Sequence, residues 1–250
     1  MQELGQAFEE RLQEIGTYLE FLEGVENAVR SGPPRIGTSG TLITVQQQRI
    51  LYSGVFLQLY NLVEATIVNC LNSITETALR AGTWFPGDLT NEIRSEWVRV
   101  MAKTHTDLNY QNRLKSAVEL CNHLVSPLPV SSFKLESGKS GNWDDTAICK
   151  ITDRLGITLE IKPETDEAIK RSFKDERGPL KLVKDLRNSL AHGSISFAEC
   201  GQNLTVTELR DLTNRIAGYL REVVQAFATY IENHEYLEPA KRPVRARAGS

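Results

Sequence analysis

The chain contains few of the residues that stabilise secreted or zinc-binding domains. It has four cysteines in 250 residues, and no two form a C-x-x-C pair: Cys70, Cys121, Cys149 and Cys200. Cys121 and His123 are close in sequence, but no second pair has the matching spacing of a zinc site. We therefore expect reduced thiols, no disulfide framework, no metal ion and no other cofactor.

Strong charge and long hydrophobic runs are lacking too. The formal net charge is −3, which argues against a protein that coats nucleic acid along its whole surface but allows a local basic site. The most apolar stretch, 55–74, is interrupted by Asn61, Glu64 and Asn69, so it falls short of the roughly 18 apolar residues of a membrane span. Residues 1–29 contain no continuous apolar segment like that of a signal peptide. We expect a soluble cytoplasmic protein with no membrane contact.

Helical periodicity is the main structural signal present. Apolar residues recur every three or four positions along the first helix, at Phe8, Leu12, Ile15, Leu19 and Leu22. This helix should end before the Gly32-Pro33-Pro34 turn, and a second helix, about 45–80, is apolar around most of its circumference, as expected of the middle of a bundle. Further helices are predicted at about 89–104, 107–125, 144–155 and 164–175.

The last helix begins at a capping box, in which Thr205 and Glu208 satisfy each other's backbone amides. Together these segments predict an all-α helical bundle in a single domain, 1–238, with an irregular, loop-rich insertion at about 126–143. The Gly138-Lys139-Ser140 stretch of this insertion lacks the first glycine and the preceding strand of a phosphate-binding loop. We expect a disordered basic tail at 239–250, which carries Lys241, Arg242, Arg245 and Arg247.

The segment 177–193 combines a defined helix with residues suited to catalysis. Pro179 is suited to the first helical turn and Gly193 to the position just after the last one, so the helix should end at His192. At about 100° per residue, the core stripe contains Val183, Leu186 and Leu190, Arg187 borders it, and the opposite face carries Lys181, Lys184, Asn188 and His192. The small Ala191 would let another surface approach. The prediction is a positively charged ridge with one imidazole near its end.

This combination is suited to phosphodiester chemistry. Arginine offers a planar fork of donors to phosphate, and histidine transfers protons near neutral pH. RNA carries its own nucleophile in the 2′-hydroxyl, so two copies of one Arg and one His, brought together in a symmetric dimer, would suffice without a metal. The alternative is structural: a His-Gly pair often ends a helix, and an Arg-Asn-Lys ridge is often a solvated face. A second Arg/His spacing, Arg99 to His105, lacks the asparagine, the proline start and the glycine stop.

The segment R-N-S-L-A-H-G resembles the R-x4–6-H motif of the HEPN superfamily, in which a polar residue, often Asn, follows the arginine. The resemblance extends over 178–235, is weaker over 45–80 and is absent over 80–175. The chain is similar to a bacterial branch of small, stand-alone HEPN ribonucleases. It implies a homodimer that cleaves RNA through the 2′-hydroxyl, leaving 2′,3′-cyclic phosphate ends, with Arg187 and His192 catalytic and Asn188 supporting. Many such proteins are toxins or effectors of antiviral defence.

Polar residues near this motif are candidates for a supporting role. Glu64 and Asn61 interrupt the apolar 45–80 helix, and in the resembling family such a position often faces the catalytic pair. Glu64 therefore either orients Arg187 or serves a structural or solvent-facing role, while Lys184 would add charge to the ridge. An alternative function also stays open: a non-catalytic HEPN interaction or regulatory module, held in a complex with a sensor or antitoxin partner.

Overall fold

The computed structural model describes residues 2–29, 32–36, 40–80, 83–104, 106–130, 133–135 and 142–243. These residues contain helices and no β-strand, which confirms the predicted all-α class. The α-helices are α1 (Gln2–Val29), α2 (Val45–Arg80), α3 (Asn91–Met101), α4 (Tyr110–Val125), α5 (Asp145–Leu155), α6 (Pro163–Lys170), α7 (Pro179–Ala191), α8 (Phe197–Cys200) and α9 (Val206–Glu232). Two short 3-10 helices, η1 (Pro86–Asp88) and η2 (Pro239–Lys241), accompany them.

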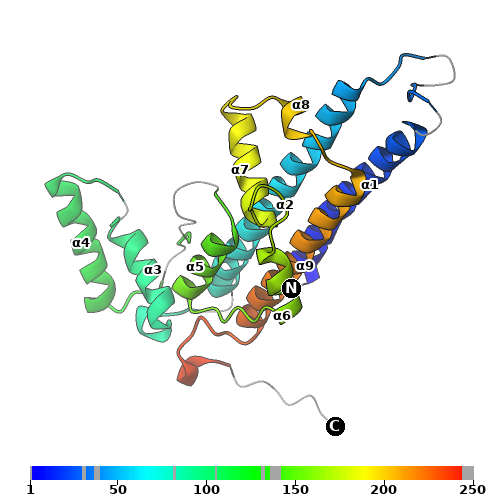
Figure 1. Cartoon of the computed structure of the whole chain (residues 1–250). Coiled ribbons are helices and arrows are strands. Elements are labelled where there is room, and N and C mark those ends of the chain that lie inside the picture. The colour runs from blue at the N-terminus through cyan, green and yellow to red at the C-terminus, as the bar shows by residue number, and fades with distance from the viewer. Residues whose placement is uncertain are drawn as a thin grey trace, which may run out of the picture.

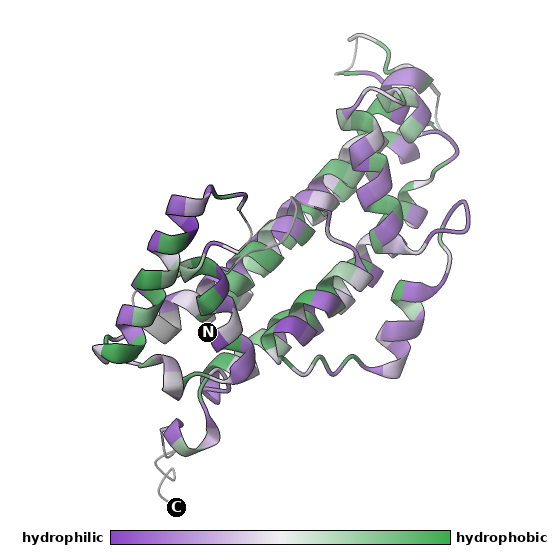
Figure 2. Cartoon of the chain, turned by 90° about the vertical axis from the view of Figure 1, so that its left-hand side faces the viewer, coloured by the Kyte–Doolittle hydropathy of each residue, from purple (hydrophilic) through white to green (hydrophobic). Residues whose placement is uncertain are grey.

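The long helices α1, α2 and α9 run side by side and form the body of the bundle (Figure 1). Helix α2 contacts α1, α7, α8 and α9, so its predicted central place is confirmed. Its buried side chains include Val55, Phe56, Leu59, Leu62, Val63, Ile67 and Ile74. Hydrophobic residues alternate with hydrophilic ones along these helices, the pattern of amphipathic elements that share one core (Figure 2).

Among the described residues, one helix, Val45–Glu76, has the length and composition to cross a membrane. In the bundle, 56% of its most apolar window is buried inside the protein. A helix enclosed on several sides by other helices needs such an apolar circumference.

Helices α3, α4 and α5 lie to one side of this body (Figure 1). The carboxylate of Glu96 on α3 is buried between two arginines, 3.4 Å from Arg99 and 3.1 Å from Arg154 of α5. Helix α4 packs on α3, where His123 meets the edge of the Trp97 ring with the ring centroids 5.4 Å apart. His105, the second half of the Arg99–His105 spacing, lies outside the described residues.

The predicted helix boundaries are largely reproduced. The Thr205–Glu208 capping box is present at the start of α9. Two predictions need correction. The helix expected at 164–175 ends at Lys170, because the chain then enters a turn in which the Phe173 amide donates to the Arg177 carbonyl. The turn-rich stretch after Gly193 contains the short helix α8, which begins at a capping box formed by Ser196 and Glu199.

The predicted insertion and tail both contain residues that contact the folded body of the protein. Phe133, Leu135 and Trp143 of the insertion are buried in the core, while residues 131–132 and 136–141, with the Gly138–Ser140 stretch, lie outside the described residues. At the other end, Pro239–Lys241 form η2, and the Lys241 ammonium lies 3.0 Å from the Asp88 carboxylate. The tail predicted to be disordered from Pro239 therefore begins with a short helical turn that an ion pair joins to η1. Residues 244–250, with Arg245 and Arg247, lie outside the described residues.

Candidate active site

Helix α7 presents the motif residues at the edge of the core. Leu180, Leu182, Val183 and Leu190 are buried, whereas Leu186 is only partly buried. The predicted core stripe is thus confirmed for Val183 and Leu190, and it is wider than predicted toward the start of the helix. Arg187 and Asn188 are half-buried, while Ala191 and His192 are exposed.

The Arg187 side chain is held by two neighbours. Its guanidinium carbon lies 4.6 Å from the centroid of the Tyr60 ring on α2, within the range of a cation–π contact. Its Nη1 donates a hydrogen bond of 3.0 Å to Oδ1 of Asn188. Both contacts leave the guanidinium charge intact, and most of its N–H donors stay available to a phosphate.

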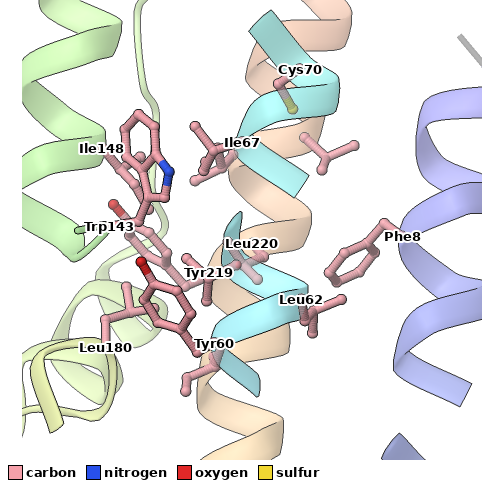
Figure 3. Close-up of a cluster of buried hydrophobic side chains, with 14 of the residues drawn as sticks. Phe8, Tyr60, Leu62, Ile67, Cys70, Trp143, Ile148, Leu180, Tyr219 and Leu220 are labelled. Atoms are coloured by element: carbon pink, nitrogen blue, oxygen red, sulfur yellow. The ribbon is translucent and has the colours of Figure 1, made fainter. Parts of the chain in front are cut away.

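Tyr60 is itself fixed in the core. Its side chain is 3% exposed and lies among buried side chains that include Trp143 and Leu180 (Figure 3). Burial raises the pKa of the Tyr60 hydroxyl above its usual value, the Glu64 carboxylate raises it further, and the Arg187 guanidinium acts in the opposite direction. The hydroxyl is therefore neutral at physiological pH, so Tyr60 offers Arg187 an aromatic face and no negative charge.

Asn188 and Lys184 are both engaged by the residues just before α5. Nδ2 of Asn188 donates a hydrogen bond of 2.8 Å to Oδ1 of Asn142. The Lys184 ammonium forms an ion pair with the Asp144 carboxylate, and both side chains are less than one-fifth exposed. The predicted ridge of free positive charge must therefore be corrected, because the charge of Lys184 is neutralised by an acid that precedes it by 40 residues.

Asp144 has a second role as the N-cap of α5, where its Oδ1 accepts a hydrogen bond of 2.8 Å from the Ala147 amide. Burial alone would raise the pKa of Asp144, but the hydrogen bonds from the Lys184 ammonium and the Ala147 amide outweigh it. The net effect is a pKa below the usual carboxyl value. Asp144 is therefore ionised at neutral pH, as its ion pair with Lys184 requires.

His192 occupies the C-cap of α7, and its imidazole is exposed. The helix ends in a Schellman motif, in which the Ser194 amide donates to the Ser189 carbonyl and the Gly193 amide to the Leu190 carbonyl. Gly193 has a φ of +67°, a left-handed conformation that favours glycine. The motif helix thus ends where the sequence predicted, with His192 at its C-terminal end.

The two supporting residues expected on α2 lie in different surroundings. Glu64 is half-buried, and its charge acts on the Tyr60 hydroxyl. Among the ion pairs of the described residues there is none between Glu64 and Arg187, whereas the Tyr60 ring on the same helix lies within cation–π range of Arg187. Asn61 is exposed to solvent.

Three residues that contact the motif are absent from the sequence-based set: Tyr60, Asn142 and Asp144. Asp144 could have been identified from the sequence, because it is the first residue of the helix predicted at 144–155 and is of a type that favours the N-cap, the position it holds before α5. Nothing in the local pattern links it to Lys184. Among the described residues, no group of three or more His, Cys, Asp or Glu side chains is placed to hold a metal ion.

Comparison with known proteins places the chain in a family. The family model of the MAE_28990-like HEPN domain matches residues 1–236. No curated protein and no solved structure matches the chain. The match also covers 80–175, where the sequence by itself suggested no resemblance, so the peripheral helices α3 to α5 are part of the family's domain. The chain belongs to the MAE_28990-like HEPN family.

Proposed function

We propose that this protein is a metal-independent endoribonuclease that cleaves RNA through its own 2′-hydroxyl and acts in the cytoplasm as a toxin or an antiviral-defence effector. One observation carries the proposal: Arg187 is held between Tyr60 and Asn188 with its charge unpaired by any carboxylate in the described residues, and the exposed His192 follows on the same helix. Membership in a HEPN family, in which ribonucleases are common, supports the proposal.

The chemistry needs a charge stabiliser and proton transfer. The 2′-oxygen of the ribose attacks the adjacent phosphorus, and the bond from phosphorus to the 5′-oxygen breaks. This gives a 2′,3′-cyclic phosphate and a 5′-hydroxyl. One proton leaves the 2′-hydroxyl and one is delivered to the 5′-oxygen, both tasks that imidazole performs near neutral pH. Arg187 would stabilise the negative charge that develops on the phosphate oxygens.

A single α7 does not supply the whole set. Arg187 and His192 are five residues apart, about 7.5 Å along the helix axis and about 140° around it. A symmetric homodimer that faces two α7 helices toward each other would provide two arginines and two histidines in one groove. One imidazole could then act as base and the other as acid. The exposed Ala191 beside His192 offers room for such an approach.

Cleavage of RNA by purified protein in excess EDTA tests the proposal. Wild type should degrade RNA to 2′,3′-cyclic phosphate ends. His192→Ala and Arg187→Lys should lose at least about a hundredfold in rate, because general acid–base transfer and the guanidinium fork are each removed. Ser194→Ala, at an exposed position two residues away, should cleave like wild type. Full activity of a folded His192→Ala protein, or strict dependence on added metal, would rule out this mechanism.

A second candidate function is a non-catalytic HEPN module bound to a sensor or antitoxin protein. The observation that favours it is the outer face of α4, where Tyr110 is 75% exposed, Leu114 49% and Val118 50%. Exposed apolar stripes of this kind mark protein–protein contacts. An inactive wild type that forms a stable complex through α4 would support this candidate instead.

A further inference from the structure

The segment just before α5 meets the motif helix in two matched contacts. Lys184 and Asn188 are one helical turn apart, about 6 Å along α7, and so lie on the same face. Asn142 and Asp144 are two residues apart in a non-helical stretch, a separation of about 6.6 Å when extended. The two spacings agree, so Asn142 reaches Asn188 while Asp144 reaches Lys184.

Trp143, between these two residues, anchors the segment. Its side chain is 5% exposed and lies in the buried cluster with Tyr60 and Leu180 (Figure 3). The flanking side chains, Asn142 and Asp144, extend instead toward the polar face of α7. The segment is therefore fixed to the same core that carries the Tyr60 ring under Arg187.

Asn142 and Arg187 engage the two ends of the Asn188 amide. Because Nδ2 of Asn188 donates to Asn142, its Oδ1 is turned toward Nη1 of Arg187. A rotated amide would present N–H donors to a guanidinium that has only donors, and the hydrogen bond could not form. Asn142 thus acts on Arg187 through Asn188.

We propose that Asn142 and Asp144 are positioning residues of the nuclease site: Asn142 orients the Arg187 guanidinium through Asn188, and Asp144 fixes α7 through Lys184 and withholds that lysine from RNA. The catalytic part rests on the proposed ribonuclease activity. The geometric part, the orientation of Arg187 and the fixing of α7, does not depend on that activity.

Asp144→Asn isolates the ion pair from the helix cap. Asparagine is as good an N-cap as aspartate, so α5 keeps its first turn while Lys184 loses its counter-charge. Asp145→Asn is the matched control, because it makes the same charge change one residue later, and the α7 lysine pairs with Asp144 instead. Asn142→Ala removes the amide relay without changing any charge.

In cleavage assays, Asn142→Ala and Asp144→Asn should each lower kcat about tenfold to a hundredfold, since a misplaced catalytic group affects the chemical step. KM should stay within about twofold in Asn142→Ala, which changes no charge. Asn142→Ala combined with Asn188→Ala should be no slower than the slower single variant, because both break one relay. Asp145→Asn should match wild type. An unchanged kcat in Asn142→Ala, multiplied losses in the double variant, or equal effects of Asp144→Asn and Asp145→Asn would overturn the proposal.

A second readout does not depend on activity. The ¹⁵N guanidinium resonance of Arg187 can be assigned by its loss in Arg187→Lys. In wild type and in Asp145→Asn, the Tyr60 ring should shift this resonance away from the chemical shift of a freely rotating arginine. In Asn142→Ala it should move toward the value of a freely rotating arginine. If wild type shows these resonance shifts but cleaves no RNA, the ribonuclease proposal is wrong and the positioning role of Asn142 is supported. If wild type cleaves RNA but Asn142→Ala leaves the Arg187 resonance unchanged, the ribonuclease proposal is supported and the positioning role is wrong.

Discussion

An arginine that binds phosphate must be held in place and must keep its charge, and the contact between Tyr60 and Arg187 meets both needs. An aromatic face attracts the guanidinium without competing as an anion would, and the ring is locked because its side chain is 3% exposed. A carboxylate at the same place would hold Arg187 more strongly, but it would also offset the positive charge that a phosphate recognises. Tyr60 is thus suited to orienting Arg187 for its ligand.

Substitutions at Tyr60 separate the ring from the hydroxyl. Tyr60→Phe keeps the face under Arg187, and its cleavage rate should stay within about threefold of wild type. Tyr60→Leu removes the face and underfills the core, so it should lower kcat at least about tenfold and destabilise the fold by roughly 1–3 kcal/mol. Cleavage kinetics and urea unfolding measure the two effects. Equal activity of the two variants would show that the ring does not orient Arg187.

The ion pair of Asp144 with Lys184 predicts a specific pH dependence of stability. The pKa of Asp144 is lower in the folded chain than its ordinary value of 3.8. A carboxyl of this kind stabilises the fold above its unfolded pKa, and the contribution is lost as the pH falls through its folded pKa. The free energy of unfolding of wild type should therefore exceed that of Asp144→Asn at pH 7, and the two should converge below about pH 3.8. A gap that persists unchanged in acid would contradict this assignment.

At the residue scale, the sequence predicted the motif better than its surroundings. Arg187, Asn188 and the C-cap His192 belong to one helix whose ends are marked by proline and glycine, so local rules place them. Whether Lys184 keeps a free charge depends on Asp144, which lies just before α5 and reaches Lys184 across 40 residues of sequence. No periodicity within either helix carries that information.

The helices themselves were predicted wherever several turns shared one apolar face. The 45–80 segment coincides with α2, and the capping box at Thr205 fixed the start of α9. Helix α8 was missed because its four residues bury only Cys200, although Ser196 and Glu199 form a capping box that sequence alone can reveal. Short helices depend on caps more than on periodicity.

The end of the motif helix gives a test at the element scale. Gly193 has a φ of +67°, and a Cβ placed there would meet no atom within 4 Å, so Gly193→Ala carries conformational strain without a clash. It should destabilise the fold by about 1–2 kcal/mol, and Gly193→Asn by less. Gly218→Ala is the matched control: the added Cβ is equally unhindered inside α9, where alanine should stabilise by roughly 0.5–1 kcal/mol. Urea unfolding of the three variants should show these opposite signs.

Across the whole molecule, a buried acid links the peripheral helices. Glu96 of α3 is buried and pairs with Arg154 of α5. Glu96→Gln removes the carboxylate charge that lies beside Arg99 and Arg154, and it should cost about 1–3 kcal/mol, less than the loss of a fully buried pair because both arginines reach solvent. Glu92→Gln, at an exposed site on the same helix, should be nearly neutral. Equal unfolding free energies for the two variants would show that the buried pair contributes nothing.

The pairing of Lys184 with Asp144 gives a prediction for RNA binding. Because Lys184 already has a carboxylate partner, the neutral pair Lys184→Met with Asp144→Asn should leave the salt dependence of RNA affinity unchanged. Arg187→Ala should make the slope of log affinity against log salt shallower by about one, because one phosphate is no longer neutralised. Filter binding over a range of salt concentrations measures both. A shallower slope in the Lys184/Asp144 variant would show that Lys184 contacts phosphate.

The central place of α2 has a consequence for synthesis on the ribosome. Helix α2 ends at residue 80, but α9, which covers it from the opposite end of the chain, ends only at residue 232. At about 5–20 residues per second, the ribosome needs roughly 8–30 s to make the intervening stretch. Of the helices α1, α7, α8 and α9 that pack on α2, only α1 has been made until α7 begins at residue 179, and α9 is completed last. The motif helix is therefore itself made late. A nascent-chain chaperone would meet this protein in its most aggregation-prone form before any Arg187–His192 pair exists, so solubility is at risk earlier than activity begins.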